Sequence, residues 1–173
     1  YTPYSKKWLS TVTEKDFENY SSGLQFNNWL TAHFEEIIPL QKMGFEATEI
    51  ELPGKELRME TVEKYADERN FPAKDSTSHL GLHYRFGTVS IRKMAKTASK
   101  SQENTYLKEL IWREFFMTIL HHFPRVVENN YSSKYDGIEW RNNDEEFEKW
   151  KKGQTGYPLV DAGMRELNKT GFM

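Results

Sequence analysis

The carboxylate of Glu109 and the guanidinium of Arg113 stand among aromatic rings in the apolar-rich run at residues 105–123. At about 100° per residue, Glu109 and Arg113 would share one third of a helix circumference with Tyr106 and Trp112. Buried charges need specific partners, and large rings suit flat ligands as well as protein cores. The spacing therefore favours a polar stripe that faces a cavity.

A simpler interpretation is that Glu109 and Arg113 form an ordinary ion pair, four residues apart, on a solvated helix face. Taken alone, this interpretation is the stronger one. The aromatic residues Tyr106 and Trp112, three positions away on either side of Glu109, weaken it because they favour burial.

A second group of polar residues occupies the loop at residues 75–81, which is rich in hydroxyl groups. Consecutive residues such as Thr77 and Ser78 are good phosphate contacts, especially ahead of a helix. The alternative is an ordinary helix-capping cluster, which the spacing alone favours.

The elements that must position these residues are all predicted to be helical. No Gly or Pro interrupts residues 104–123, so we expect one long helix, buried at the centre of an all-α domain. Other expected helices lie at 61–69, 90–98, 144–152 and 158–170, the last two with clear capping and stop residues. Residues 10–57 read as a connector with few elements, apart from a helix at 29–38 and short extended pieces within 39–57.

Composition excludes several classes of protein. The sequence has no cysteine, which rules out disulfides, zinc fingers and iron–sulfur clusters, and it shows no other metal-ligand cluster, so no metal is expected. The net charge of -2 argues against a uniformly basic nucleic-acid binder but allows a local basic patch. No apolar run approaches the roughly 20 residues of a membrane span, so we expect a soluble cytoplasmic protein.

Three stretches together resemble the DNA photolyase/cryptochrome family, and most closely the bacterial cyclobutane-dimer photolyases. They are residues 77–80 with 85–90, residues 109–116, and the run GQTGYPLVDAGMR at 153–165. The resemblance implies that residues 1–57 are the end of an antenna domain and an interdomain connector. It also implies that residues 58–173 are the N-terminal half of a helical FAD-binding domain, and that the chain is a fragment.

The resemblance assigns a set of residues to the cofactor FAD. Six of them would contact the pyrophosphate and its neighbours: Tyr65, Thr77, Ser78, His79, Leu80 and Gly81. Tyr106 stands where the family often has a Trp beside the flavin, and Phe172 replaces another Trp near the cofactor. Glu109 and Arg113 match a polar pair between flavin and substrate.

The resemblance also assigns residues to DNA and to electron transfer. Trp112 would pack on a flipped-out thymine dimer, and Arg69 would contact a backbone phosphate. Glu109 and Arg113 would also face the dimer, with Glu109 steadying the radical anion. Trp140 matches the outermost tryptophan of the chain that reduces the flavin.

The implied function is light-driven repair, in which reduced FAD gives an electron to a cyclobutane pyrimidine dimer in DNA. An antenna chromophore would lie in an N-terminal domain absent from this chain, and we expect the chain alone to hold FAD weakly or not at all. No obligate protein partner is expected. The alternatives are a cryptochrome-type photoreceptor without repair activity, and a helical interaction module whose polar stripe is structural.

Overall fold

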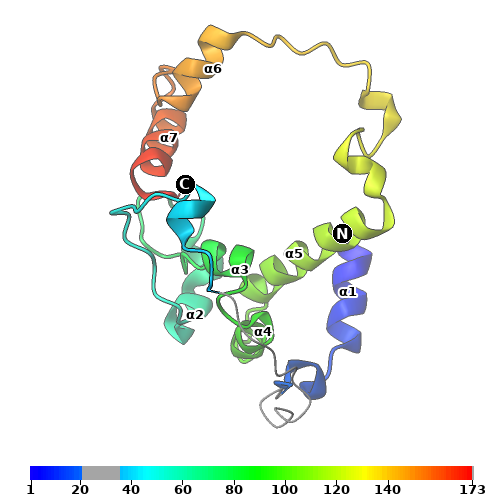
Figure 1. Cartoon of the computed structure of the whole chain (residues 1–173). Helices are drawn as coiled ribbons and strands as arrows, with labels where there is room; N and C mark the ends of the chain where they lie inside the picture. The colour runs from blue at the N-terminus through cyan, green and yellow to red at the C-terminus, as the bar shows by residue number, and fades with distance from the viewer. Residues whose placement is uncertain (21–35, 173) are drawn as a thin grey trace. The chain divides into compact units, whose positions relative to one another are not determined.

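A computed structural model describes residues 1–20 and 36–172, and within these ranges the chain is helical and contains no strand. The expected all-α fold is confirmed. The α-helices, drawn in Figure 1, are α1 (Thr2–Thr11), α2 (Met59–Glu68), α3 (Gly81–Phe86), α4 (Ile91–Ala98), α5 (Thr105–His122), α6 (Asp144–Lys151) and α7 (Pro158–Thr170). Short 3-10 helices are η1 (Glu14–Phe17), η3 (Leu40–Met43), η4 (Pro124–Val127) and η5 (Ser133–Tyr135).

The chain divides into two compact units. The first comprises residues 1–19 and 53–142, and the second comprises residues 20–52 and 143–173. This division rests on compactness and leaves the family-based boundary between residues 57 and 58 a prediction.

The core of the first unit forms around the first half of α5. Helices α1, α2 and α4 all pack against α5. The residues that this packing removes from water are mainly aliphatic, which makes burial the main source of stability here. They include Val62, Leu80, Met94, Ala98, Leu107, Leu110 and Ile111.

The expected long helix at 104–123 is confirmed as α5, but its predicted burial is correct only for its first half. Leu107 and Ile111 are buried, whereas Phe116 is 61% exposed and Leu120 is 49% exposed. Helix α1 also reaches the second half of α5, where Tyr4 contacts Phe115 and Thr118, but it covers one side only. Continuous apolarity along a helix therefore did not mean continuous burial among the described residues.

The described part of residues 12–57 contains few regular elements, as the sequence predicts, while its role as a connector stays a prediction. Residues 44–58 contain no regular element, and η3 is the only element between residues 36 and 58. Of the helix expected at 29–38, residues 29–35 lie outside the described residues, and residues 36–38 are not helical. Helix α1 was not anticipated, although Pro3 stands in its first turn, where proline is well tolerated.

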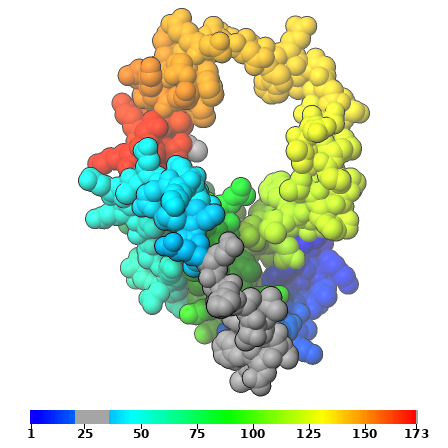
Figure 2. Space-filling view, in the orientation of Figure 1, coloured from blue at the N-terminus to red at the C-terminus, as the bar shows by residue number. Residues whose placement is uncertain are grey.

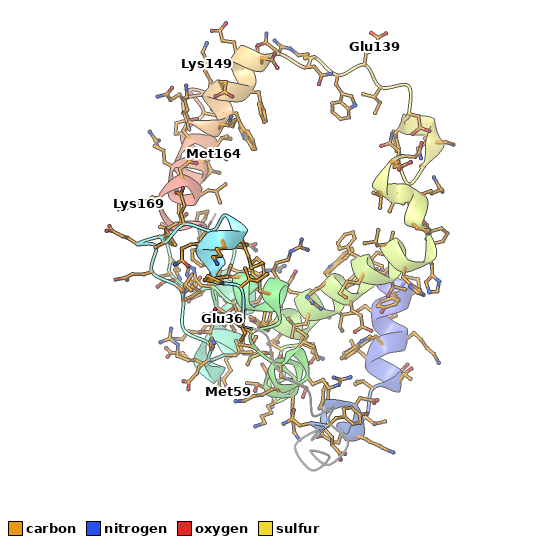
Figure 3. The ribbon with its side chains drawn as sticks, in the orientation of Figure 1. Glu36, Met59, Glu139, Lys149, Met164 and Lys169 are labelled. Carbon is orange, nitrogen blue, oxygen red and sulfur yellow. The ribbon has the colours of Figure 1, made fainter. Side chains whose placement is uncertain are left out.

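In the second unit, α6 and α7 begin and end as the sequence predicts. The Asn143 side chain accepts a hydrogen bond of 3.0 Å from the Glu146 backbone N–H, which caps α6. Pro158 is the first residue of α7, and Gly171 ends the helix with a φ of 78°. Met164 of α7, labelled in Figure 3, is buried.

Residues 124–142 lie almost entirely at the surface, as the yellow-to-orange stretch of the space-filling view illustrates (Figure 2). Turns and 3-10 helices dominate this segment. None of the helices in the described part of the chain is long and apolar enough to span a membrane.

Candidate functional site

A chain of hydroxyl groups links α3, α5 and the loop at residues 75–80. The Tyr106 hydroxyl donates to Ser78 Oγ at 2.8 Å, and the hydroxyls of Tyr84 and Tyr106 are also 2.8 Å apart. The Leu80 backbone N–H contacts the same Ser78 oxygen at 3.4 Å. Burial raises the pKa of both Tyr84 and Tyr106, so both phenols keep their protons at neutral pH.

The hydroxyl loop itself is only partly engaged. Thr77 is exposed and Ser78 is half-buried, so one of the two predicted phosphate contacts is open to solvent. Ser76 Oγ is buried, and no described residue forms a hydrogen bond with it. Leu80 caps α3 without a side-chain bond, which gives the capping interpretation of Ser78 no support at that helix.

Local sequence explains why the loop is held in place. Helix α3 ends at Gly87, whose φ of 64° suits glycine. The buried His83 ring then bridges two other segments, with Nδ1 2.6 Å from Thr88 Oγ1 and Nε2 2.9 Å from the Pro53 carbonyl oxygen. His79 adopts a φ of 52° and lies 2.8 Å from Asp75 Oδ1. The loop is therefore closed by one contact within it and followed by a helix that His83 fixes to Thr88 and Pro53.

Glu109 pairs with Arg69, which follows α2, and not with Arg113 as the simpler interpretation held. The Arg69 guanidinium also lies 5.5 Å from the centre of the Tyr65 ring. Hydrogen bonding to Glu109 raises the pKa of Arg69, so the guanidinium stays charged. Arg113 donates to the Tyr84 carbonyl oxygen at 3.3 Å. The two ends of the predicted polar stripe thus have different partners.

Trp112 has one ring face covered by Tyr1. The two ring centres are 3.4 Å apart and the planes differ by 6°, while the Tyr1 hydroxyl donates to the Lys108 carbonyl oxygen at 2.9 Å. Phe115 contacts Trp112 edge-on, with ring centres 5.6 Å apart. The indole is therefore pre-stacked on aromatic neighbours instead of lying free.

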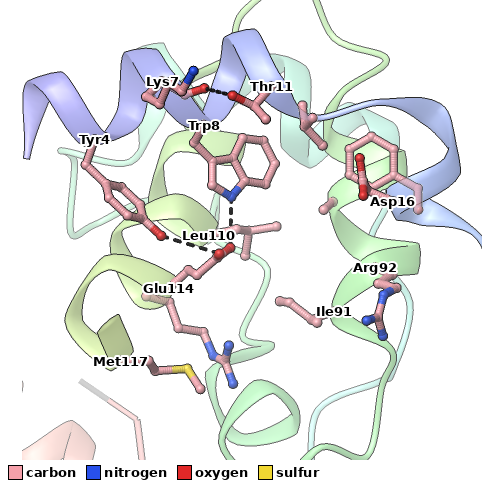
Figure 4. Close-up of a pocket in the computed structure, with 14 residues that line it drawn as sticks. Tyr4, Lys7, Trp8, Thr11, Asp16, Ile91, Arg92, Leu110, Glu114 and Met117 are labelled. Atoms are coloured by element: carbon pink, nitrogen blue, oxygen red, sulfur yellow. Dashed lines mark hydrogen bonds between the residues drawn. The ribbon is translucent and has the colours of Figure 1, made fainter. Parts of the chain in front are cut away.

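A pocket of about 650 Å³ lies between α1, η1, α4 and α5 (Figure 4). Trp8 Nε1 donates to Glu114 at 2.8 Å and the Tyr4 hydroxyl donates to the same carboxylate at 3.3 Å. Of the predicted site residues, only Arg113 lines this pocket. This pocket therefore adjoins Arg113 of the predicted polar stripe and the neighbouring Glu114. Glu109, the other charged residue of the stripe, is not among its lining residues.

Three other predicted site residues are Trp140, Phe172 and Gly81. Trp140 stands in the extended segment before α6, next to the labelled Glu139 of Figure 3, and is 72% exposed. Phe172 follows α7 in the second unit. Gly81 begins α3, and a Cβ atom there would meet nothing within 4 Å, so the backbone does not require glycine at this position.

The structure brings together Tyr65, Arg69, Ser78, Tyr106 and Glu109, all in the first unit. Sequence reasoning missed Tyr84 and Tyr1. Both make their contacts with α5 across a large separation in sequence, 22 residues for Tyr84 and 107 for Tyr1, so no local spacing could reveal them.

Comparison with known proteins gives these residues a context. The family model described as "FAD binding domain of DNA photolyase" matches residues 106–173. A deoxyribodipyrimidine photo-lyase from Neurospora crassa is 37% identical over 66% of this chain and 20% of its own length. A second one, from Alkalihalophilus pseudofirmus, is 30% identical over 100% of this chain and 40% of its own length.

A solved structure agrees with the sequence comparisons. The crystal structure of a bacterial class III photolyase from Agrobacterium tumefaciens superimposes with a TM-score of 0.60 at 37% identity, over 65% of this chain and 25% of that one. This chain thus spans between a fifth and two fifths of the length of these proteins. In its sequence, its helical fold and the matched flavin-domain segment, this chain is thus similar to part of the DNA photolyases.

Proposed function

We propose that this chain is part of a deoxyribodipyrimidine photo-lyase, a light-driven enzyme that splits cyclobutane pyrimidine dimers in DNA. The observation that carries the proposal is the cluster of Ser78, Tyr106, Glu109 and Arg69 on and around α5. Tyr106 and Glu109 of this cluster lie in the segment that the photolyase family model matches. The relatives are named for that activity, and they match this chain over only part of their own length.

The residues of the hydroxyl loop fit an FAD diphosphate. Phosphate oxygens accept hydrogen bonds, and the loop offers hydroxyl donors at Thr77 and Ser78 beside the unpaired Ser76 Oγ. Helix α3 has only six residues, so the fit rests on these hydroxyls and not on a helix dipole. His79, Leu80 and Gly81 would complete the loop around the diphosphate. Tyr65, Tyr106, Arg113 and Phe172 are proposed to border the rest of the cofactor.

Bound FAD, once reduced, would supply an electron to the dimer under blue light. The protein's task at the dimer is to hold the two linked pyrimidines out of the helical stack, where they can be reached. We assign Trp112 to stacking on the dimer, in place of Phe116, which stacks on the indole with ring centres 5.4 Å apart. Such stacking typically contributes about 1–3 kcal/mol per base. Trp140 would pass electrons inward from the surface, for which its 72% exposure is suitable.

Arg69 and Glu109 are both proposed to contact DNA, and their ion pair suggests that the two contacts form one after the other. A DNA phosphate would compete with the carboxylate for Arg69. Glu109 would then be free to accept a hydrogen bond from the dimer's N–H edge. Arg113 keeps its contact with the Tyr84 carbonyl and would add positive charge nearby.

The longer protein would contain further parts that the family resemblance implies. We propose the boundary between connector and FAD-binding domain at residues 57/58, with an antenna chromophore bound in a preceding domain. Pyrimidine-dimer DNA is the proposed partner. A cytoplasmic location and the absence of an obligate protein partner stay predictions.

The decisive experiment is a repair assay with the intact protein and an oligonucleotide that carries one thymine dimer. We expect dimer loss under blue light and none in the dark. Arg69→Gln should weaken binding of damaged and undamaged DNA alike, whereas the surface variant Lys134→Gln should change neither. Flavin uptake without repair would support the cryptochrome-type photoreceptor instead, and absence of flavin would support the interaction module.

A further inference from the structure

A buried phenol, Tyr106, and a partly buried one, Tyr84, stand behind the proposed phosphate-binding serine. Tyr106 is only 4% exposed, and it lies between the Tyr84 hydroxyl and Ser78 Oγ, 2.8 Å from each. Only Tyr106 of the two was assigned to the site above, and it was assigned for its ring. The hydroxyl groups have no role in that assignment.

The direction of the hydrogen bonds follows from counting protons. A tyrosine hydroxyl has one proton to donate. Tyr106 gives its proton to Ser78, so the bond between the two phenols must be donated by Tyr84. Burial raises the pKa of both phenols, which keeps both donors protonated.

This direction determines what Ser78 can do. A serine hydroxyl has two lone pairs and one proton. The Tyr106 hydroxyl and the Leu80 backbone N–H occupy the two lone pairs, at 2.8 and 3.4 Å. No described residue accepts the Ser78 proton. Ser78 is thereby left as a donor, which is the form that suits a phosphate oxygen.

We propose that Tyr84 is a positioning residue that acts through Tyr106 to hold the Ser78 hydroxyl as a hydrogen-bond donor to the diphosphate of FAD. This inference rests on the proposed function. Replacing Tyr84 by Phe leaves the Tyr106 proton free to turn toward other acceptors, and Ser78 regains the freedom to donate its proton to Tyr106. The donor aimed at the ligand is then present only part of the time.

The test compares FAD with riboflavin, which has the same ring system but no phosphate. Apoprotein of the intact protein is titrated with each flavin, and dissociation constants are read from flavin fluorescence. Tyr84→Phe should weaken FAD binding roughly three- to tenfold, the effect of one lost hydrogen bond. Riboflavin binding should change less than about twofold, because riboflavin has no group for Ser78 to contact.

Two further variants separate positioning from general packing. In a Ser78→Ala background, Tyr84→Phe should cause no additional loss of FAD affinity, because the phenols act through that serine. Tyr106→Phe removes the hydroxyl that lies between Tyr84 and Ser78, and it should cause the same selective loss of FAD affinity. The control Tyr4→Phe removes a phenol that is hydrogen-bonded to Glu114 and not to the loop. This variant should change the affinity for neither FAD nor riboflavin.

The outcomes keep the two proposals distinct. The proposed role of Tyr84 would be overturned by equal losses of affinity for FAD and riboflavin, or by a full additional loss of FAD affinity in the Ser78→Ala background. Either result would leave the proposed function intact. If wild-type protein binds no FAD at all, both the relay and the proposed function are wrong. Should Tyr84→Phe fail to fold by circular dichroism, Tyr106→Phe and its double variant with Ser78→Ala decide the same question.

Discussion

Gly153, in the loop between α6 and α7, should tolerate no side chain. Its φ is 62°, a backbone region that costs a residue with a Cβ atom about 1 kcal/mol. A Cβ at this position would also lie 2.7 Å from the Asp161 carbonyl oxygen and 2.9 Å from Arg165 Cγ. The Arg165 side chain can shift, but the carbonyl belongs to α7 and cannot shift without disturbing the helix. Overpacking of this kind costs about 1–3 kcal/mol.

Gly156 provides a matched control in the same loop. Its φ of 86° imposes the same kind of backbone strain, but a Cβ there would meet nothing within 4 Å. Gly153→Ala should therefore destabilise the α6–α7 unit by about 2–4 kcal/mol, and Gly156→Ala by about 1 kcal/mol.

Hydrogen–deuterium exchange of peptides from α7 measures this difference locally, since amides exchange when the unit opens. A gap of about 1–3 kcal/mol corresponds to exchange roughly 5- to 150-fold faster in Gly153→Ala than in Gly156→Ala. Equal exchange in the two variants would refute the argument that close approach to α7, and not backbone strain alone, explains the glycine at residue 153.

Three other predictions concern single residues. Asp161 accepts hydrogen bonds from the Thr155 hydroxyl and backbone N–H and from the Gly156 backbone N–H. These bonds hold the pKa of Asp161 below its ordinary value. The stability that the ionised Asp161 adds is therefore present above about pH 4 and is lost as pH falls through the lowered pKa. Asp161→Asn should flatten that acid limb in a thermal-melt pH series, and an unchanged limb would contradict the assignment. Trp112→Ala should weaken binding of dimer-containing DNA by about 1–3 kcal/mol in a titration while flavin content stays constant, whereas equal loss for undamaged DNA would make Trp112 a packing residue. Trp140→Phe should slow flavin photoreduction, followed by absorbance, and leave repair by pre-reduced flavin unchanged; normal photoreduction would remove Trp140 from the electron path.

Local rules were sufficient to predict most helix boundaries. Asn143 caps the start of α6 with its side chain, Pro158 begins α7 and Gly171 ends it, as the preferences of these residue types predict. The absence of Gly and Pro before Pro124 likewise predicted the extent of α5. These features depend on residues within one or two turns of one another, so the sequence contains all the information that they need.

Tertiary partners could not be predicted in the same way. The sequence offered Arg113 as the neighbour of Glu109 on one helix face, but Arg69 competes from another helix and forms the pair. Trp112 was expected to present a ring to the substrate, and Tyr1 covers one of its faces. Uniform apolarity also gave a wrong prediction of burial: Phe116 is exposed, although α1 contacts its helix neighbours Phe115 and Thr118. Each of these contacts depends on packing between segments far apart in the chain.

The central claim is that the hydroxyl loop and α5 belong to a flavin site. It is tested most directly by the amount of FAD in the purified intact protein, released by denaturation and measured by absorbance. The account predicts close to one FAD per chain, or stoichiometric uptake when FAD is added to the apoprotein. A protein that carries no flavin and takes up none on reconstitution would contradict it.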